Sequence, residues 1–273
     1  MEWTTKAEEA IKKVPFFVRK KVRARVEKEA LADNKHEVTI KEVKLTQKRF
    51  LTNMSAEIKG YQLDNCFGAN GCPHRAVQSE TLVKRLEALL QNADILGFLQ
   101  KNVKGSLKFH HEFRVTVAEC PNSCSQPQIK DVGIIGGSIP EITDEDCSMC
   151  GGCVDVCRED AVTLLEDNEV PQIDFAACLK CGKCADVCPT GTIKKGNDGY
   201  RVLLGGKLGR HPRLAAELDG ISSEDEVLVI VEKCIAYYKA NSTGGKRFAE
   251  LVYDKDPEKM RALLNSQFTN SAQ

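Results

Sequence analysis

Cysteine is the residue type through which this sequence could do most chemistry, since 13 of its 273 residues are cysteines. The N-terminus lacks the charged-then-apolar pattern of a signal peptide. The longest apolar run, residues 227–231, is too short to span a bilayer. We therefore expect a soluble, cytoplasmic protein. In a reducing cytosol disulfides are disfavoured, and thiolates at close, regular spacing usually bind metal.

Eight of the cysteines form an internal repeat with an offset of 31 residues. Each copy has the spacing C-x2-C-x2-C-x3-C, and the copies begin at Cys147 and Cys178. Two-residue gaps let successive thiolates wrap one cubane, while the fourth cysteine is carried over to the other cluster. We therefore predict two 4Fe–4S clusters, one held by Cys147, Cys150, Cys153 and Cys188, the other by Cys178, Cys181, Cys184 and Cys157.

This repeat resembles bacterial two-cluster ferredoxins throughout its length. Its glycines Gly151, Gly152 and Gly182 suit backbone that lies close to inorganic sulfide. Arg158 stands where the family usually has proline, a departure that removes no ligand. A pair of zinc sites is the alternative, because zinc also takes four thiolates, but zinc motifs seldom show eight cysteines at this doubled spacing.

Five cysteines lie outside the repeat. Cys234 belongs to an apolar row at helical spacing and is predicted to be a small buried hydrophobe. The other four form two pairs, Cys66 and Cys72 in a C-x5-C spacing and Cys120 and Cys124 in a C-x3-C spacing. Neither pair has the spacing of a zinc ribbon.

In their settings the two pairs resemble the cluster motif of siroheme-dependent sulfite and nitrite reductases. These settings are Asp64-Asn65-Cys66-Phe67-Gly68 and Cys120-Pro121-Asn122-Ser123-Cys124. The likeness includes residues 113–117 and 131–136 and resumes beyond the repeat at 205–210. A ferredoxin inserted at this point is similar to the dissimilatory and small anaerobic members of that family.

The resemblance implies a third 4Fe–4S cluster on Cys66, Cys72, Cys120 and Cys124, with Cys124 bridging to the iron of a siroheme. In that family six electrons pass through this pair to reduce sulfite to sulfide, or nitrite to ammonia. Cationic side chains on the open face bind the anion and supply protons.

Several cations are candidates for those contacts. The catalytic candidates are Arg114, Lys108, His110 and His111, with Lys104 and Arg75 as further cations. The histidine pair is the more suggestive because histidine titrates near neutral pH. Lys207 and Arg210 are candidates to bind a tetrapyrrole carboxylate, with a solvated turn as the alternative. The family often has a Lys-x-Lys pair on the strand that enters C-x3-C, where this chain has Glu112 and Arg114.

Two functions follow from these patterns. The first is a redox enzyme that passes low-potential electrons through the ferredoxin clusters to the third cluster and siroheme, reducing sulfite or nitrite. The alternative is a non-catalytic electron-transfer protein or subunit with three clusters and no siroheme. Glu112 favours the alternative, as does the short segment before Cys66, where full-length siroheme enzymes carry a further lobe. A zinc-dependent nucleic-acid module lacks suitable spacing and a basic middle.

Charge distribution bears on partners. The formal net charge is zero, but residues 1–50 carry 14 Lys/Arg against 8 Asp/Glu, while residues 141–199 carry 5 against 13. The sequence has no P-loop or dinucleotide fingerprint, so we expect electrons to enter from a donor protein with a positively charged docking face. The missing lobe indicates a partner subunit or self-association.

The elements that must position these residues predict an α+β fold. Helical spacing predicts a helical N-terminal domain over 1–45 with a break at Pro15, followed by a polar connector over 46–58. That domain resembles, in Trp3, Ala7, Ile11, 15–19 and 27–30, the small C-terminal helical domain of light-independent protochlorophyllide reductases.

The remainder is predicted to be a sulfite-reductase-like α/β module with a ferredoxin inserted into it. The module spans 60–140 and 196–245, the insert 141–195, and a helical tail 246–273. Within the module we expect a helix over 80–98, strands over 113–117, 132–135 and 200–204, and a helix opening at Ser223 with Glu226 in a capping box.

Overall fold

The computed structural model describes residues 1–14, 16–33, 35–56, 58–165 and 170–269. Its elements form two compact units. The first comprises Met1–Ile58 and Ser106–Phe109, and the second Lys59–Gly105 and His110–Gln273. The predicted mixture of helices and sheet is confirmed.

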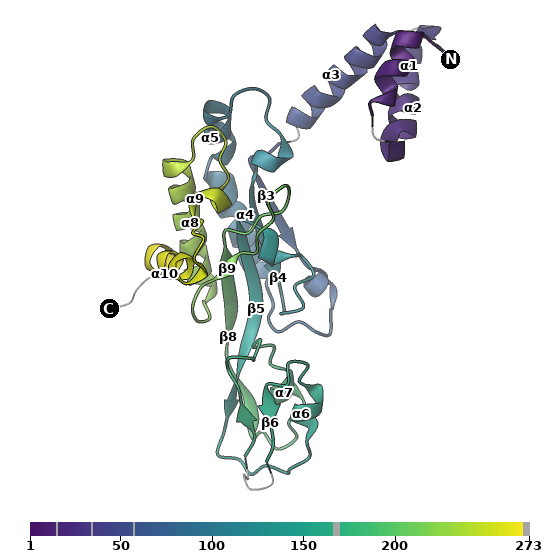
Figure 1. Ribbon diagram of the computed structural model, residues 1–273. Helices are drawn as coiled ribbons and strands as arrows, with labels where there is room; N and C mark the ends of the chain where they lie inside the picture. Colours follow the sequence, from purple (N-terminus) through teal and green to yellow (C-terminus); the bar gives the residue numbers. More distant parts are fainter. Residues whose placement is uncertain (15, 34, 57, 166–169, 270–273) are drawn as a thin grey trace. The chain divides into compact units, whose positions relative to one another are not determined.

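The first unit is helical, as the periodicity predicts (Figure 1, purple). Its N-terminal strand pairs in parallel with a short strand between the second and third helices, and three helices pack around Ala7, Val26, Ala30 and Val38. The strands are β1 (Glu2–Trp3) and β2 (Glu37–Val38), and the helices are α1 (Thr5–Lys12), α2 (Phe16–Ala32) and α3 (Ile40–Ala56).

The predicted connector over 46–58 is wrong, because α3 continues to Ala56. Thr39 and Glu42 fix the start of this helix, since the Glu42 carboxylate accepts from the Thr39 backbone N–H at 3.0 Å. The polar composition beyond position 46 therefore belongs to a helix and not to an irregular linker. The break expected at Pro15 lies outside the described residues, although α1 ends at Lys12 and α2 begins at Phe16.

A five-stranded mixed sheet forms the centre of the second unit, in the order β3-β4-β5-β8-β9 (Figure 1). The first three strands are parallel, and β8 and β9 run antiparallel to their neighbours. The bounds are β3 (Tyr61–Asn65), β4 (Phe113–Ala118), β5 (Val132–Ile142), β8 (Ile193–Leu204) and β9 (Ala216–Glu217). The predicted strands over 113–117, 132–135 and 200–204 all lie within this sheet.

Helices cover the sheet. They are α4 (Glu80–Asn92), α5 (Ile95–Asn102), α8 (Glu224–Asn241), α9 (Phe248–Leu251) and α10 (Pro257–Phe268). The single helix expected over 80–98 is two helices, because Asp94 adopts a left-handed φ of 45° and caps α5 by accepting from the Gly97 N–H. The capping box of Ser223 and Glu226 is confirmed at the start of α8, whose apolar row, including Cys234, is buried.

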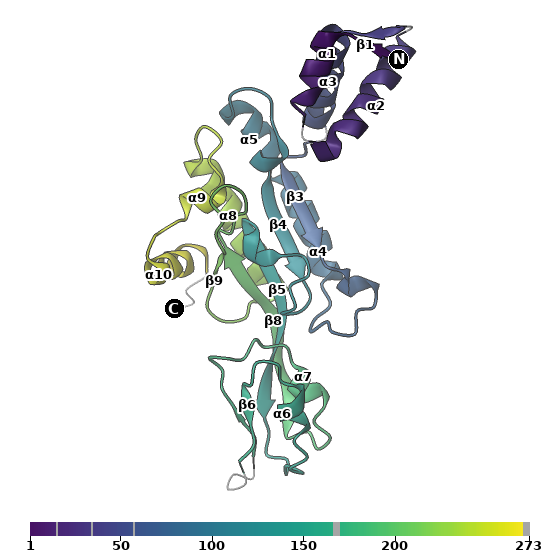
Figure 2. The same cartoon turned by 45° about the vertical axis from the view of Figure 1, so that its right-hand side comes forward.

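The insert leaves the sheet through long extensions of β5 and β8, which pair with each other as far as Ile142 and Ile193 (Figure 2). Two short helices and a two-stranded ribbon complete it: α6 (Gly152–Val156), α7 (Lys183–Asp186), β6 (Val162–Thr163) and β7 (Gln172–Ile173). Short 3-10 turns lie in loops of the second unit at Phe67–Asn70 and Pro127–Ile129. A third, at Phe109–His111, spans the point where the chain passes from the first unit to the second. No described helix is long and apolar enough to cross a membrane.

Candidate iron–sulfur sites

Four of the five cysteines outside the insert gather at one edge of the sheet. Cys66 follows β3, and Cys120 follows β4, so both lie at the carboxyl ends of neighbouring parallel strands. The Cys66 N–H donates to the Val117 carbonyl at 3.0 Å, which continues the ladder to the first ligand position. We call Cys66, Cys72, Cys120 and Cys124 the sheet-edge set.

The electrostatics of Cys120 show that this set lies close together. Burial raises the pKa of the Cys120 thiol, and charge on Cys66, Cys124 and Cys72 raises it further. Four crowded thiolates repel one another unless a cation neutralises them. The iron of a cluster would supply that positive charge, and metal binding would release the protons.

Backbone N–H groups are directed at the sulfur of Cys66. It accepts from Gly68 at 3.4 Å and from Glu119 at 3.3 Å. Glu119 itself is buried, and its carboxylate accepts from the Ser79 backbone N–H at 3.0 Å and hydroxyl at 2.8 Å. This carboxylate thereby ties the start of α4 to the loop that carries Cys120.

The eight cysteines of the insert separate into two sites of four. Cys147, Cys150, Cys153 and Cys188 line one cavity, and we call them the outer set. Cys157, Cys178, Cys181 and Cys184 line another, and we call them the inner set. The exchange of the fourth cysteine that the repeat predicts is present in the geometry. Cys157, from the first copy, lies with the cysteines of the second copy, and Cys188, from the second copy, lies with those of the first.

Each insert site has features that suit an anionic iron–sulfur group. Backbone N–H groups of Met149 and Ile193 donate to outer-set sulfurs, and those of Ala161 and Lys180 to inner-set sulfurs, at 3.3 to 3.4 Å. Such hydrogen bonds stabilise charge on cluster thiolates. Burial raises the pKa of Cys184 to about 11, so this thiol needs a metal to become a thiolate at neutral pH.

All thirteen cysteines are free thiols. Across the described ranges, no three His, Cys, Asp or Glu side chains lie close enough to hold a single metal ion.

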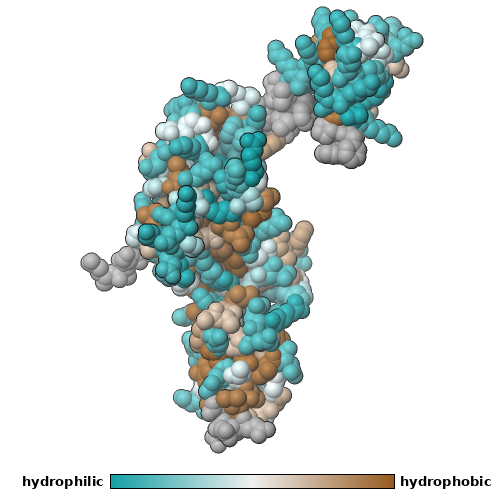
Figure 3. Space-filling model, viewed as in Figure 1, coloured by the Kyte–Doolittle hydropathy of each residue, from teal (hydrophilic) through white to brown (hydrophobic). Residues whose placement is uncertain are grey.

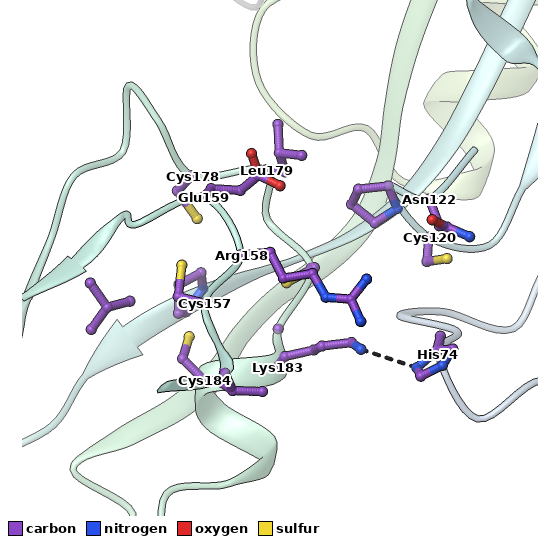
Figure 4. Close-up of a pocket in the computed structure, with 16 residues that line it drawn as sticks. His74, Cys120, Asn122, Cys157, Arg158, Glu159, Cys178, Leu179, Lys183 and Cys184 are labelled. Atoms are coloured by element: carbon purple, nitrogen blue, oxygen red, sulfur yellow. Dashed lines mark hydrogen bonds between the residues drawn. The ribbon is translucent and has the colours of Figure 1, made fainter. Parts of the chain in front are cut away.

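The inner set and Cys120 of the sheet-edge set line a common cavity of about 350 Å³ (Figure 4). Cys120, Pro121, Asn122 and His74 line it from the sheet side. The segment that carries the inner set is fixed to the sheet, because the Ser138 N–H donates to the Lys180 carbonyl at 2.7 Å.

Comparison with known proteins decides the family. A model of the nitrite and sulphite reductase 4Fe-4S domain matches residues 61–271. The chain belongs to this family. A second model, the proto-chlorophyllide reductase 57 kD subunit, matches residues 3–46. The resemblances to the sulfite and nitrite reductases and to protochlorophyllide reductase are confirmed, whereas no match bears on the ferredoxin resemblance of the insert.

Individual relatives of this reductase family match parts of the chain. The coenzyme F420-dependent sulfite reductase of Methanocaldococcus jannaschii is 31% identical over 185 residues, 66% of this chain and 29% of that protein. One subunit of the anaerobic sulfite reductase of Salmonella typhimurium is 31% identical over 74 residues, 27% of this chain and 22% of that protein.

A solved structure resembles the fold. Dissimilatory sulfite reductase I gives a TM-score of 0.50 at 16% identity, with 83% of this chain and 60% of that chain covered. The chain thus spans less than two thirds of the length of each of these three relatives.

Three of the four predicted catalytic residues lie at the opposite end of β4 from the sheet-edge set. His110, His111 and Arg114 lie at the amino end of β4, whereas Cys120 follows its carboxyl end. At about 3.3 Å per strand residue, this separation is about 20 Å. Lys108 belongs to the first unit. His110, His111 and Arg114 therefore lie apart from Cys120 along β4, and the catalytic role of these three residues and of Lys108 stays a prediction.

Glu112 has a structural role. Its carboxylate is buried and accepts from the Lys59 backbone N–H at 2.9 Å and from the Gln62 side-chain amide at 2.7 Å. It faces the edge strand and no anion site. The family's Lys-x-Lys position is thus used here to hold β3 against β4.

The cofactor-binding candidates differ in their surroundings. Lys207 Nζ forms an ion pair with Glu250 Oε1 at 3.0 Å, so its charge is shared with a carboxylate. Arg210 is exposed on the turn that follows Gly205 and Gly206. Arg75, in the same loop as Cys72, forms an ion pair with Glu80 at 3.5 Å.

Sequence reasoning missed His74 and Lys183 as neighbours of the cysteine sites. Lys183 Nζ lies 3.0 Å from His74 Nδ1, and this contact joins the insert to the C-x5-C loop (Figure 4). The departure at Arg158 was a signal, because that residue lines the same cavity. The residues that line the sheet side of this cavity, His74 and residues 120–122, are 36 or more positions away from Arg158 in the sequence. Their proximity to Arg158 could be found only from the fold.

Proposed function

We propose that this chain is an iron–sulfur redox protein of the sulfite and nitrite reductase type that holds three 4Fe–4S clusters. The observation that supports this most is the gathering of twelve cysteines into three sets of four. Backbone N–H groups are directed at sulfurs in every set. Bound there, the clusters would supply one-electron transfer.

The chain's own residues would hold and tune these clusters. The outer, inner and sheet-edge sets would each ligate one cluster, and the N–H donors would stabilise the charge of the thiolates. The acidic insert would attract an electron-donor protein with a positive face, since opposite charges steer association. Exposed apolar residues of the insert, including Leu165 and Phe175, offer that donor a contact surface (Figure 3).

Cys124 is the residue we propose as the bridge to siroheme. Its thiol is exposed, and the Asn122 side-chain amide donates to its sulfur at 3.2 Å. Phe67, in the same loop region as Cys66, is 81% exposed and offers an apolar surface for a macrocycle. Siroheme would supply the centre at which sulfite or nitrite is reduced. Cations for the anion would then come from a partner subunit or a second copy.

The second candidate is an electron-transfer subunit without siroheme. The observation in its favour is the position of His110, His111 and Arg114, which leaves the sheet-edge set without the predicted substrate contacts. In this case the sheet-edge cluster would pass electrons to a partner that carries the catalytic centre.

Reconstitution with siroheme distinguishes the two candidates. Anaerobic protein is incubated with iron, sulfide and siroheme, desalted, and studied by absorption. A Soret band and a sharp red band in the wild type, absent in Cys124→Ser and retained in the control Cys234→Ala, would support the reductase, and sulfite and nitrite reduction would be assayed next. Broad cluster absorption alone in the wild type would contradict siroheme binding and leave the electron-transfer subunit.

A further inference from the structure

The cavity between the inner and sheet-edge sets carries a concentration of positive charge. The cations Arg158 and Lys183 line it, together with His74, the four inner-set cysteines and Cys120 of the sheet-edge set. In Figure 4 the Arg158 guanidinium and the Lys183 side chain extend from the insert toward Cys120 and His74. One carboxylate, Glu159, also lines the cavity, but it lies beside Leu179 and away from the guanidinium (Figure 4).

This charge stands out against the composition of the insert. Residues 141–199 contain 13 Asp/Glu and only 5 Lys/Arg. Lys194 and Lys195 form ion pairs with Glu141 at 3.6 Å and Asp186 at 2.7 Å. In the described part of the chain, neither Arg158 nor Lys183 forms an ion pair with a carboxylate; Lys183 contacts the ring nitrogen of His74 instead. Among the described residues, the charges of Arg158 and Lys183 are therefore not neutralised by a carboxylate within ion-pair distance.

The Lys183 side chain and the neighbouring cysteine segment are held in place by contacts. The Lys183 ammonium donates to His74 Nδ1 at 3.0 Å, so the C-x5-C loop fixes its direction. The segment carrying Cys178 and Cys181 is anchored to the sheet, because the Leu179 carbonyl accepts from Arg201 at 3.2 Å and the Lys180 carbonyl from Ser138 at 2.7 Å. The Lys183 charge therefore has a defined position beside the inner set.

We infer that the positive charges of Arg158 and Lys183 make reduction of the inner-set cluster easier than that of the outer-set cluster. This inference rests on the proposed cluster ligation. Adding one electron, without a proton, adds one negative charge to the group on the inner set. Arg158 and Lys183, which line the same cavity, favour the added negative charge by Coulomb attraction. The described residues that line the outer-set cavity include no cation. Electrons would then be drawn toward the side of the insert that faces Cys120.

The test is a potentiometric titration with dithionite, followed by electron paramagnetic resonance of the reduced clusters. The variants are Arg158→Gln, Lys183→Gln and the double variant. Lys259→Gln is the matched control, because it also removes one positive charge but lies on the exposed surface of α10. Iron content is measured on every sample.

We expect one component of the titration to move to lower potential in both single variants, and the other components to stay. In the double variant, reduction of that component should become about tenfold less favourable, which is 59 mV for a one-electron couple. Lys259→Gln should move nothing. High salt should weaken the Arg158 effect, since salt screens charges that solvent can reach.

Two results would overturn the inference in different ways. Full iron content with equal potentials in wild type and double variant would remove the role of the two cations and leave the proposed function standing. Wild-type protein without iron at the inner set would remove the proposed cluster ligation and the inference with it.

Discussion

At the scale of single residues, Glu119 links the sheet-edge set to the helical layer. Its backbone N–H donates to the Cys66 sulfur at 3.3 Å, and its buried carboxylate holds Ser79 at the start of α4. Gly68 leaves room for this carboxylate, because a Cβ at position 68 would overlap its oxygen Oε2. One glycine therefore sets the geometry around a proposed cluster ligand.

Gly68→Ala should disturb the sheet-edge cluster and spare the other two. The added methyl group displaces Glu119, and the Cys66 sulfur then loses a hydrogen bond. We expect iron per chain to fall from about 12 toward about 8. Asn70→Ala, an exposed change in the same 3-10 turn, is the control and should keep the full count. Unchanged iron in Gly68→Ala would contradict this account of the site.

Cys234 is expected to act through packing alone. It is fully buried in α8, and burial raises its thiol pKa well above the ordinary value. Cys234→Ala should retain all iron and lose about 1 kcal/mol of unfolding free energy. Cys234→Ser should lose about 2 kcal/mol, because a buried hydroxyl without a partner costs more. Urea unfolding measures both, and loss of iron in the alanine variant would mean that Cys234 is a ligand.

At the scale of elements, the sheet is closed against the C-terminal helices by a buried ion pair. Arg247 donates to Asp131 Oδ2 at 2.8 Å, and the Arg114 backbone N–H donates to the same oxygen at 3.0 Å. Asp131 precedes β5, and Arg247 is the N-cap of α9. Burial raises the pKa of Asp131, and Arg247 opposes that rise.

Arg247→Met should destabilise the protein by about 3 kcal/mol, because it leaves a buried carboxylate without its cation. The raised pKa of Asp131 then rises further. In the pH range between the unfolded and folded pKa values the native state binds more protons, so stability falls as pH rises. The loss should therefore be smaller at pH about 5.5 than at pH about 8. Urea unfolding at both values tests this.

The matched control for that experiment is Arg261→Met, which removes an exposed ion pair with Asp219. Exposed pairs contribute at most about 1 kcal/mol. Equal destabilisation in both variants, or a larger Arg247→Met loss at low pH, would contradict the role given to Asp131.

Most elements of the second unit were predictable because local patterns matched their burial. The strand over 113–117 and the helix opening at Ser223 each obey one period. The break at Asp94 was not predictable, since apolar spacing continues across it while a left-handed residue redirects the chain. The cysteine spacing predicted the crossed sets of the insert. The distance from His110 and Arg114 to Cys120 was also predictable, because the strand predicted over 113–117 separates them.

At the scale of the whole molecule, charge is segregated along the chain, with the acidic excess in residues 141–199. Opposite charge raises the local concentration of a small reductant near such a region, and salt screens the effect. The insert lies at the far end of the extended β5 and β8 ribbon from the sheet (Figure 2), and the outer set belongs to it.

Reduction by the cationic methyl viologen radical should therefore be faster at low than at high ionic strength. A neutral viologen analogue of similar potential should show little dependence, and stopped-flow absorption measures both rates. The reverse salt dependence, or equal dependence for both reductants, would mean that electrons enter away from the acidic insert.

The central claim is that twelve cysteines hold three 4Fe–4S clusters, and the most direct test is iron and acid-labile sulfide per chain in anaerobically purified protein. We predict about 12 irons and about 12 sulfides, without stoichiometric zinc. About 8 of each would mean that the sheet-edge set holds no cluster. Zinc without labile sulfide would contradict the account as a whole.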